Sequence, residues 1–289
     1  MAPTARSLIL DLLSTLRGGA MPVRALVAAG DLFGIAQNNV RVAATRLRND
    51  GLVERDERGR YRLGRAAQAV GEQIGSWRRV ASRLRPWRGE WVGVHGGGPA
   101  AGARRVARRP HARALRFLGF RTAAAGFDLR PDNLRGGVAA VRERLRGLGL
   151  APDARVFGVR DLEGMDEARA RALWDADGLC AAYDHSRAAL AASERRLRGL
   201  PQREAMVESF LLGGQVIRQI VFDPLLPEPI VPAGALGRLV GALQRYDALG
   251  RGCWAEFMAA QGAPHRRTPA DVRVADAAGH LAAAAGGAR

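Results

Sequence analysis

The first 64 residues combine three short helical patterns with one strand pair, and this combination restricts the possible folds more than any other feature of the chain. Apolar residues recur at helical spacing over residues 4–16, 22–30 and 36–50, and each segment ends at or next to a glycine. Alternating residues at 53–55 and 60–63 then flank a turn that contains Gly59. Three helices followed by a hairpin predict a winged helix-turn-helix over residues 1–64.

The third predicted helix has one apolar face and one polar face. Gln and Asn pair with adenine edges and Arg pairs with guanine, and residues near the start of a recognition helix usually reach the bases. We therefore expect Gln37, Asn38 and Arg41 to read bases. The other DNA-binding candidates are Thr45 on the same face, Asn39, Arg46 and Arg48 for phosphate, and Arg58 and Arg60 on the wing for phosphate or the minor groove. For any one of them, a solvated helix face is the alternative.

The pattern of apolar and polar residues divides the remainder of the chain into four further segments. Residues 65–85 read as a connecting helix that Pro86 ends. Residues 86–162 show the element order β-α-β-β-α-β, which is typical of a ferredoxin-like domain. Residues 163–262 read as an all-helical domain, and residues 263–289 are rich in Ala and Gly and are expected to be disordered. The fold class is therefore α+β.

Positive charge is concentrated in the first part of the chain. Residues 1–160 hold 30 Arg and 12 Asp or Glu, whereas residues 161–289 hold 15 Arg and 16 acids, and the chain has no Lys. This asymmetry favours a polyanionic partner for the first part. Arg104, Arg105, Arg108 and Arg109 are candidates for contact with DNA phosphate or an anionic ligand, and a solvated basic face is the alternative. No apolar run is long enough to predict a membrane span.

The order and spacing of several short motifs resemble those of PaaX-like regulators, the family of phenylacetic-acid catabolism repressors. The matching residues are Phe33-Gly34-Ile35, Val40-Arg41-Val42-Ala43, Gly51-Leu52-Val53, Trp87-Arg88-Gly89-Glu90-Trp91, Leu115 to Phe120, Leu173-Trp174-Asp175 and Ile217 to Pro227. The resemblance implies a winged helix, a ferredoxin-like middle domain similar to a CRISPR-associated endoribonuclease, and a helical C-terminal domain. It also implies a homodimer that represses aromatic-catabolism genes and is released by an aryl-CoA thioester such as phenylacetyl-CoA. The chain departs from the family at Ala36, where relatives usually carry a Ser-type helix cap, and at Asn38-Asn39.

An acyl-CoA effector needs cationic groups for its phosphates and an apolar slot for its acyl part. The candidates are Arg218, which lies within an apolar helical stripe, together with Trp174 and Tyr183. In the alternative, Arg218 is buried and paired with Asp223 or Asp175, because a buried arginine must be paired. Trp174 and Tyr183 are then core residues.

An enzymatic function is not expected. A metal-dependent nuclease built on the middle domain needs carboxylates at the end of its first strand, but that strand ends Val94-His95-Gly96. His95, His111 and His185 have no metal-ligand spacing, and the two cysteines, Cys180 and Cys253, form neither a disulfide scaffold nor a metal box. The sequence thus predicts a cytoplasmic, homodimeric transcriptional repressor that binds double-stranded DNA and has no cofactor. The alternatives are that nuclease and a nonspecific architectural DNA-binding protein.

Overall fold

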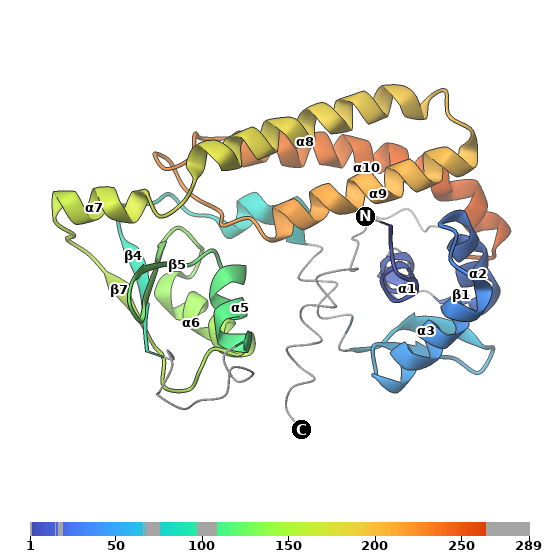
Figure 1. Cartoon of the computed structure of the whole chain (residues 1–289), viewed down its shortest axis with the longest axis horizontal. Coiled ribbons are helices and arrows are strands. Elements are labelled where there is room, and N and C mark those ends of the chain that lie inside the picture. Colours follow the sequence, from blue (N-terminus) through green and yellow to red (C-terminus); the bar gives the residue numbers. More distant parts are fainter. Residues whose placement is uncertain are drawn as a thin grey trace. The chain divides into compact units, whose positions relative to one another are not determined.

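A computed structural model describes residues 2–14, 16, 20–65, 67, 76–96 and 109–263 (Figure 1). They fall into two compact units. The terminal unit comprises Met1–Arg78, Ser186–Val221 and Leu239–Arg289, and the central unit comprises Arg79–His185 and Phe222–Arg238. Each unit therefore draws on separate stretches of the chain, and the predicted domain limits at residues 64, 85, 162 and 262 stay predictions.

The terminal unit begins with three helices and a small antiparallel sheet, as predicted for a winged helix. The elements are α1 (Ala5–Ser14), β1 (Met21–Pro22), α2 (Val23–Leu32), α3 (Gln37–Asn49), β2 (Val53–Arg55) and β3 (Arg60–Leu63). The strand order is β1-β3-β2, so the predicted hairpin gains the short strand β1 as a third member. The hydroxyl of Thr4 accepts a hydrogen bond from the Ser7 N–H at 3.1 Å and thereby caps α1. The apolar face of α1 is buried, as its spacing predicts.

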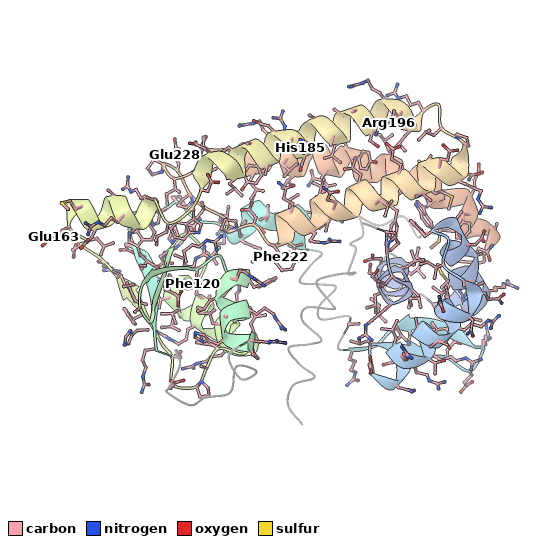
Figure 2. All side chains as sticks on the ribbon, in the orientation of Figure 1. Phe120, Glu163, His185, Arg196, Phe222 and Glu228 are labelled. Carbon is pink, nitrogen blue, oxygen red and sulfur yellow. The ribbon has the colours of Figure 1, made fainter. Side chains whose placement is uncertain are left out.

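Long helices complete the terminal unit. They are the second half of α8 (Ala176–Leu197), α9 (Gln202–Val221) and α10 (Ala235–Ala260), which lie alongside one another (Figure 1). The hydroxyls of Ser193 on α8 and Tyr246 on α10 lie 2.7 Å apart in the interior. At the surface, Arg196 of α8, which is labelled in Figure 2, pairs with Glu208 of α9 at 2.7 Å.

Three aromatic rings join the winged helix to these long helices. Phe33, in the turn after α2, packs against Phe210 of α9 with ring centroids 5.0 Å apart and lies parallel to Trp254 of α10 at 6.4 Å. The Trp254 indole N–H donates to the Met206 carbonyl at 3.0 Å, which holds the indole in place. The winged helix is thus packed on α9 and α10.

The central unit is built on a four-stranded antiparallel sheet. Its elements are β4 (Trp91–His95), α5 (Arg109–Phe117), β5 (Arg121–Ala124), β6 (Phe127–Pro131), α6 (Gly137–Gly147) and β7 (Arg155–Val159). The described elements follow the predicted β-α-β-β-α-β order, and the sheet order is β5-β6-β4-β7. Ser76–Arg83, part of the predicted connecting helix, is a 3-10 helix interrupted at Arg79, and residues 66 and 68–75 lie outside the described residues.

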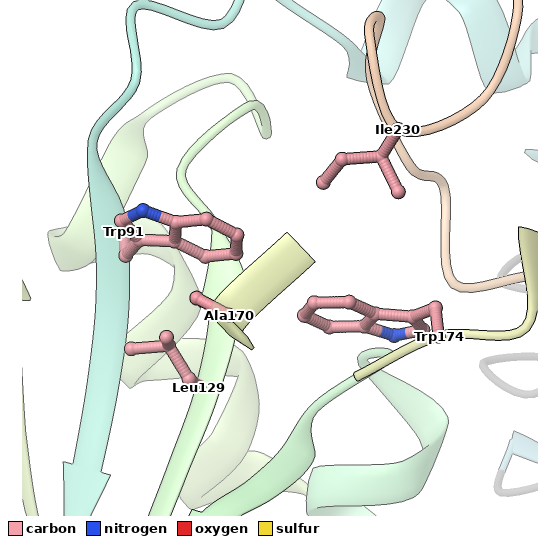
Figure 3. Close-up of a cluster of buried hydrophobic side chains, with 5 residues drawn as sticks. All are labelled: Trp91, Leu129, Ala170, Trp174 and Ile230. Carbon is pink, nitrogen blue, oxygen red and sulfur yellow. The ribbon is translucent and has the colours of Figure 1, made fainter. Parts of the chain in front are cut away.

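A cluster of apolar side chains covers one end of the sheet face that carries Trp91. Trp91, Leu129, Ala170, Trp174 and Ile230 form this cluster (Figure 3). The indoles of Trp91 and Trp174 are nearly parallel, with centroids 6.1 Å apart. Since Ala170 lies on α7 (Gly164–Arg171), this helix and the segment around Ile230 pack on the same sheet as part of the central unit.

A buried arginine ties β6 to the segment that follows α9. Arg130 donates from Nε to the Pro131 carbonyl at 3.0 Å, from Nη1 to the Leu118 carbonyl, and from Nη2 to Oδ1 of Asn133 at 2.9 Å. The Asn133 amide in turn donates to the Leu225 carbonyl at 2.7 Å. Burial lowers the pKa of Arg130 to about 9, and the Asp132 carboxylate opposes this shift. The guanidinium therefore stays charged at neutral pH, and several acceptors depend on it.

A buried carboxylate lies at the start of the same segment. Asp223 accepts a hydrogen bond from the Tyr183 hydroxyl on Oδ2 and one from the Leu225 N–H on Oδ1 at 2.8 Å. Burial raises the pKa of Asp223 from 3.8 to about 6, although both hydrogen bonds act in the opposite direction. Burial and the neighbouring carboxylate also raise the pKa of Tyr183.

The raised pKa of Asp223 predicts a pH-dependent loss of stability. Between about pH 4 and 6 the folded protein keeps a proton on Asp223 that the unfolded chain has released, so the contribution of this group to the free energy of unfolding falls as pH rises. Asp223→Asn cannot ionise, and its amide can bond both neighbours. As pH rises from 4 to 6.5, the free energy of unfolding of this variant should increase relative to that of the wild type by up to about 3 kcal/mol. Urea unfolding of both proteins across this range tests this, and a pH-independent difference would contradict it.

Candidate nucleic-acid interface

Helix α3 presents its polar face to solvent. Val40, Ala44 and Leu47 are fully buried against the rest of the winged helix. The predicted readers and phosphate contacts on this helix are all exposed: Gln37, Asn38, Asn39, Arg41, Thr45, Arg46 and Arg48. The structure therefore places these seven side chains where a duplex could reach them.

The approach of α2 to α3 depends on a glycine. A Cβ on Gly30 would lie 2.7 Å from Cγ2 of Val40, so a larger residue there would push α3 away. Gly30 lies inside α2, which continues to Leu32, and not at its end as the sequence pattern indicates. Ala36, at the start of α3, makes no side-chain cap, consistent with its departure from the family pattern. The orientation of α3 is thus set by packing.

Arg41 is oriented by a neighbour one turn earlier. With its amide oxygen facing Arg41, Gln37 accepts hydrogen bonds from Nη2 at 2.9 Å and from Nε at 3.3 Å. The Thr45 hydroxyl donates to the Arg41 carbonyl at 3.1 Å. A guanidinium held in one direction loses less entropy when it binds a guanine edge. This pair therefore orients the Arg41 guanidinium on the exposed face of α3.

The two wing arginines have different surroundings. Arg58 is exposed in the turn of the wing, next to Gly59, whose φ of +75° suits glycine. Arg60 instead donates from Nε and Nη2 to the Ala20 carbonyl, and from Nη2 to the Gly262 carbonyl at 3.2 Å. Its guanidinium is therefore engaged with the backbone of the terminal unit, which leaves Arg58 as the more accessible wing candidate.

Val42 is a surface residue that the sequence analysis did not include among the site candidates. It is 40% exposed and lies on the side of α3 opposite Val40 and Leu47. The signal was present in the spacing, because a residue two positions after a buried helical residue points away from the core. An exposed apolar side chain on a reading face suits contact with a thymine methyl group.

Two of the three effector candidates are buried, and the third is exposed. Trp174 is buried in the central unit, where its indole N–H donates to the Gly119 carbonyl at 3.1 Å, and Tyr183 is buried against Asp223. Both are core residues, which was the alternative interpretation. Arg218 is exposed on α9, so the expectation that it is buried is wrong. Val216, Ile217 and Ile220 make the buried stripe, and Arg218 points off it.

Other candidate chemistry finds little support among the described residues. No group of three or more His, Cys, Asp or Glu among them could hold a metal ion. Cys180 and Cys253 are half-buried and free. Arg109 is exposed at the start of α5, whereas Arg104, Arg105 and Arg108 lie outside the described residues, as does nearly all of the predicted disordered tail. None of the described helices is long and apolar enough to cross a membrane.

Comparison with known proteins bears on this interface. One solved structure similar to the chain is that of the uncharacterized protein Rv0674 from Mycobacterium tuberculosis. It is 25% identical, with a TM-score of 0.60, over 90% of this chain and 99% of the other. No curated protein sequence matches the chain. Residues 4–67, which contain all of α1 to β3, match the model of the family described as PaaX-like protein, and a PaaX-like domain implies a transcriptional regulator. The predicted resemblance is thus confirmed for residues 4–67, and this part of the chain is similar to PaaX-like proteins.

Proposed function

We propose that the protein is a sequence-specific, DNA-binding transcriptional repressor that reads its operator with α3. The observation that carries this proposal is the Gln37–Arg41 pair on the exposed face of a packed recognition helix. The excess of Arg over acids in the first 160 residues supports attraction to the phosphate backbone. Arg58 on the wing adds a contact to phosphate or to the minor groove.

Two further parts of the proposal rest on the family resemblance and on general geometry. One recognition helix contacts too few base pairs for useful specificity, so we infer a homodimer that binds two half-sites. Release by an acyl-CoA thioester, in control of an aromatic-compound catabolic operon, follows from the resemblance alone. Because Trp174 and Tyr183 are core residues, the acyl-binding slot is left without assigned residues.

A footprint on the DNA upstream of the protein's own gene, repeated with a panel of acyl-CoA thioesters, tests the proposal. We expect protection of two half-sites about 34 Å apart, or a multiple of this distance. Loss of protection with one thioester would identify the effector. Binding without any protected region, and governed by salt concentration alone, would instead indicate a nonspecific architectural protein.

Val42 provides a finer test of the same reading face. If it contacts a thymine methyl group, replacing that thymine with deoxyuridine should weaken wild-type binding about fourfold, the value of one buried methyl group. Val42→Ala should bind both operators alike. Equilibrium binding to operators with single deoxyuridine substitutions measures this. If every substitution affects both proteins equally, Val42 does not contact a thymine.

A further inference from the structure

Two phenylalanine rings lie on the central sheet: Phe127 is half-buried and packs against the Trp91 cluster, whereas Phe157 is exposed. Strand pairing places His95 opposite Phe127 and opposite Arg155, and places Gly93 opposite Phe157. Residues directly opposite each other share a face, so these five side-chain positions belong to the face that carries Trp91. The other face carries Val92 and Val94, which are buried, and α6 lies on it, since Val138 approaches Gly158.

The two phenylalanine rings close over a glycine. The rings of Phe127 and Phe157 are nearly parallel, at an interplanar angle of 12° and a centroid separation of 6.1 Å. A Cβ on Gly93 would lie 2.9 Å from Cε2 of Phe127 and 3.0 Å from Cε2 of Phe157. A glycine in the middle of a strand often marks a place where another group approaches closely. Here its absent side chain is what lets the two rings meet.

The exposed member of this aromatic pair, Phe157, is bordered by basic side chains. Phe157 is 38% exposed, which is unusual for a side chain of its size in the middle of a strand. Arg155 and His95 are exposed on the same face at the same end of the sheet, and Arg121, opposite Leu129, extends the basic border onto β5. The neighbouring carboxylate of Asp128 lies on the other face, where it accepts a hydrogen bond from the Thr122 hydroxyl at 2.7 Å.

We propose that Phe127 and Phe157 form a stacking platform for unpaired bases of a single-stranded nucleic acid, and that Arg121 and Arg155 bind its phosphates. Four-stranded sheets that present aromatic rings on an open face bind single strands in this way, and every base offers a face to stack on. A duplex does not fit this chemistry, because its base faces are already stacked. The platform is separate from α3, so this activity goes beyond operator binding.

A second copy of the chain is a less suitable occupant. A twofold interface brings the same patch of both copies together. Arg121 and Arg155 of both copies would then lie in the same interface, and like charges placed close together oppose association. A polyanion with planar bases complements both the rings and their border.

The test compares ring removal with ring retention in the full-length chain. Anisotropy of a labelled mixed-sequence 10-nucleotide strand, as DNA and as RNA, would be measured over a range of salt concentrations. Phe157→Leu should weaken binding about 5- to 50-fold with the same salt dependence, because stacking is lost but charge is kept. Phe157→Tyr should bind as the wild type does. Phe157→Leu should bind the operator duplex as the wild type does, which separates this site from the operator site.

Two further measurements keep the proposal falsifiable. Phe127→Leu repeats the test with the other ring, and thermal melting shows whether each variant is folded. The proposal fails if both folded leucine variants bind the single strand as tightly as the wild type, or if duplex and single-strand binding fall by the same factor. It also fails if adenosine monophosphate competes as well as the strand, which would indicate a free nucleotide ligand. Loss of a dimer in Phe157→Leu would indicate an interface between copies and would overturn it equally.

Discussion

Arg130→Ala is expected to lower the free energy of unfolding of the central unit by about 3–5 kcal/mol, the range for breaking a buried charged network by removing one member. The substitution leaves the Leu118 and Pro131 carbonyls and Oδ1 of Asn133 without the donor that they share. Each unsatisfied buried acceptor carries its own desolvation cost. It also removes one of two cations near Asp132, which keeps its ion pair with Arg85 at 2.6 Å.

Arg135→Ala is the matched control for this experiment. Arg135 lies five residues further along and is exposed, so its loss should change stability by less than about 0.5 kcal/mol. Urea titration with hydrogen exchange read at the amides of β4 and β6 reports on the central unit separately from the winged helix. Equal effects of the two substitutions would show that the Arg130 hydrogen bonds add nothing to stability.

Arg41→Ala is expected to weaken binding to the specific operator by about 10- to 100-fold, because a bidentate contact to guanine is worth about 1–3 kcal/mol. Binding to random duplex DNA should fall much less, by the share of one phosphate contact. Gln37→Ala should produce a smaller loss in the same direction, since it removes the group that orients the guanidinium. Competitive binding assays at one fixed salt concentration measure the ratio of operator affinity to random-DNA affinity for each variant.

Arg24→Ala is the control for the loss of one positive charge. Arg24 is exposed and lies on α2, not on α3, so its substitution should weaken specific and random binding alike and only slightly. If Arg41→Ala also lowers both affinities by one common factor, Arg41 contacts phosphate and some other residue reads the bases.

Local patterns were sufficient to predict the three helices and the hairpin of the winged helix, and the order of the elements along the central unit. The apolar spacing of α1 and α3, the turn at Gly59 and the element sequence from Trp91 to Val159 are all encoded within short windows. Strand β1 was not predicted, because Met21 and Pro22 become a strand only by pairing with Tyr61 and Arg60. No local signal marks a two-residue strand whose partner lies forty residues away.

The side-chain predictions diverged where tertiary contacts decide the outcome. The polar face of α3 was predictable because helical geometry alone sets it. Arg60 has a local sequence like that of the other wing residues, but its guanidinium donates to the carbonyls of Ala20 and Gly262, which are distant in sequence. Asp223 or Asp175 was expected as a partner for a buried Arg218, but Arg218 is exposed and Asp223 accepts a hydrogen bond from the Tyr183 hydroxyl. Such pairings depend on which elements meet in space.

The contact of Phe33 with Phe210 and Trp254 has a mechanical consequence for α3. Phe33 lies in the turn between α2 and α3, so α3 cannot rotate against α9 unless three rings separate and expose apolar surface. The bond from Arg60 to the Gly262 carbonyl holds the wing to the end of α10 in the same way. These contacts therefore fix the orientation of α3 relative to α9 and α10. A displacement of α9 and α10 would move the exposed face of α3 with them.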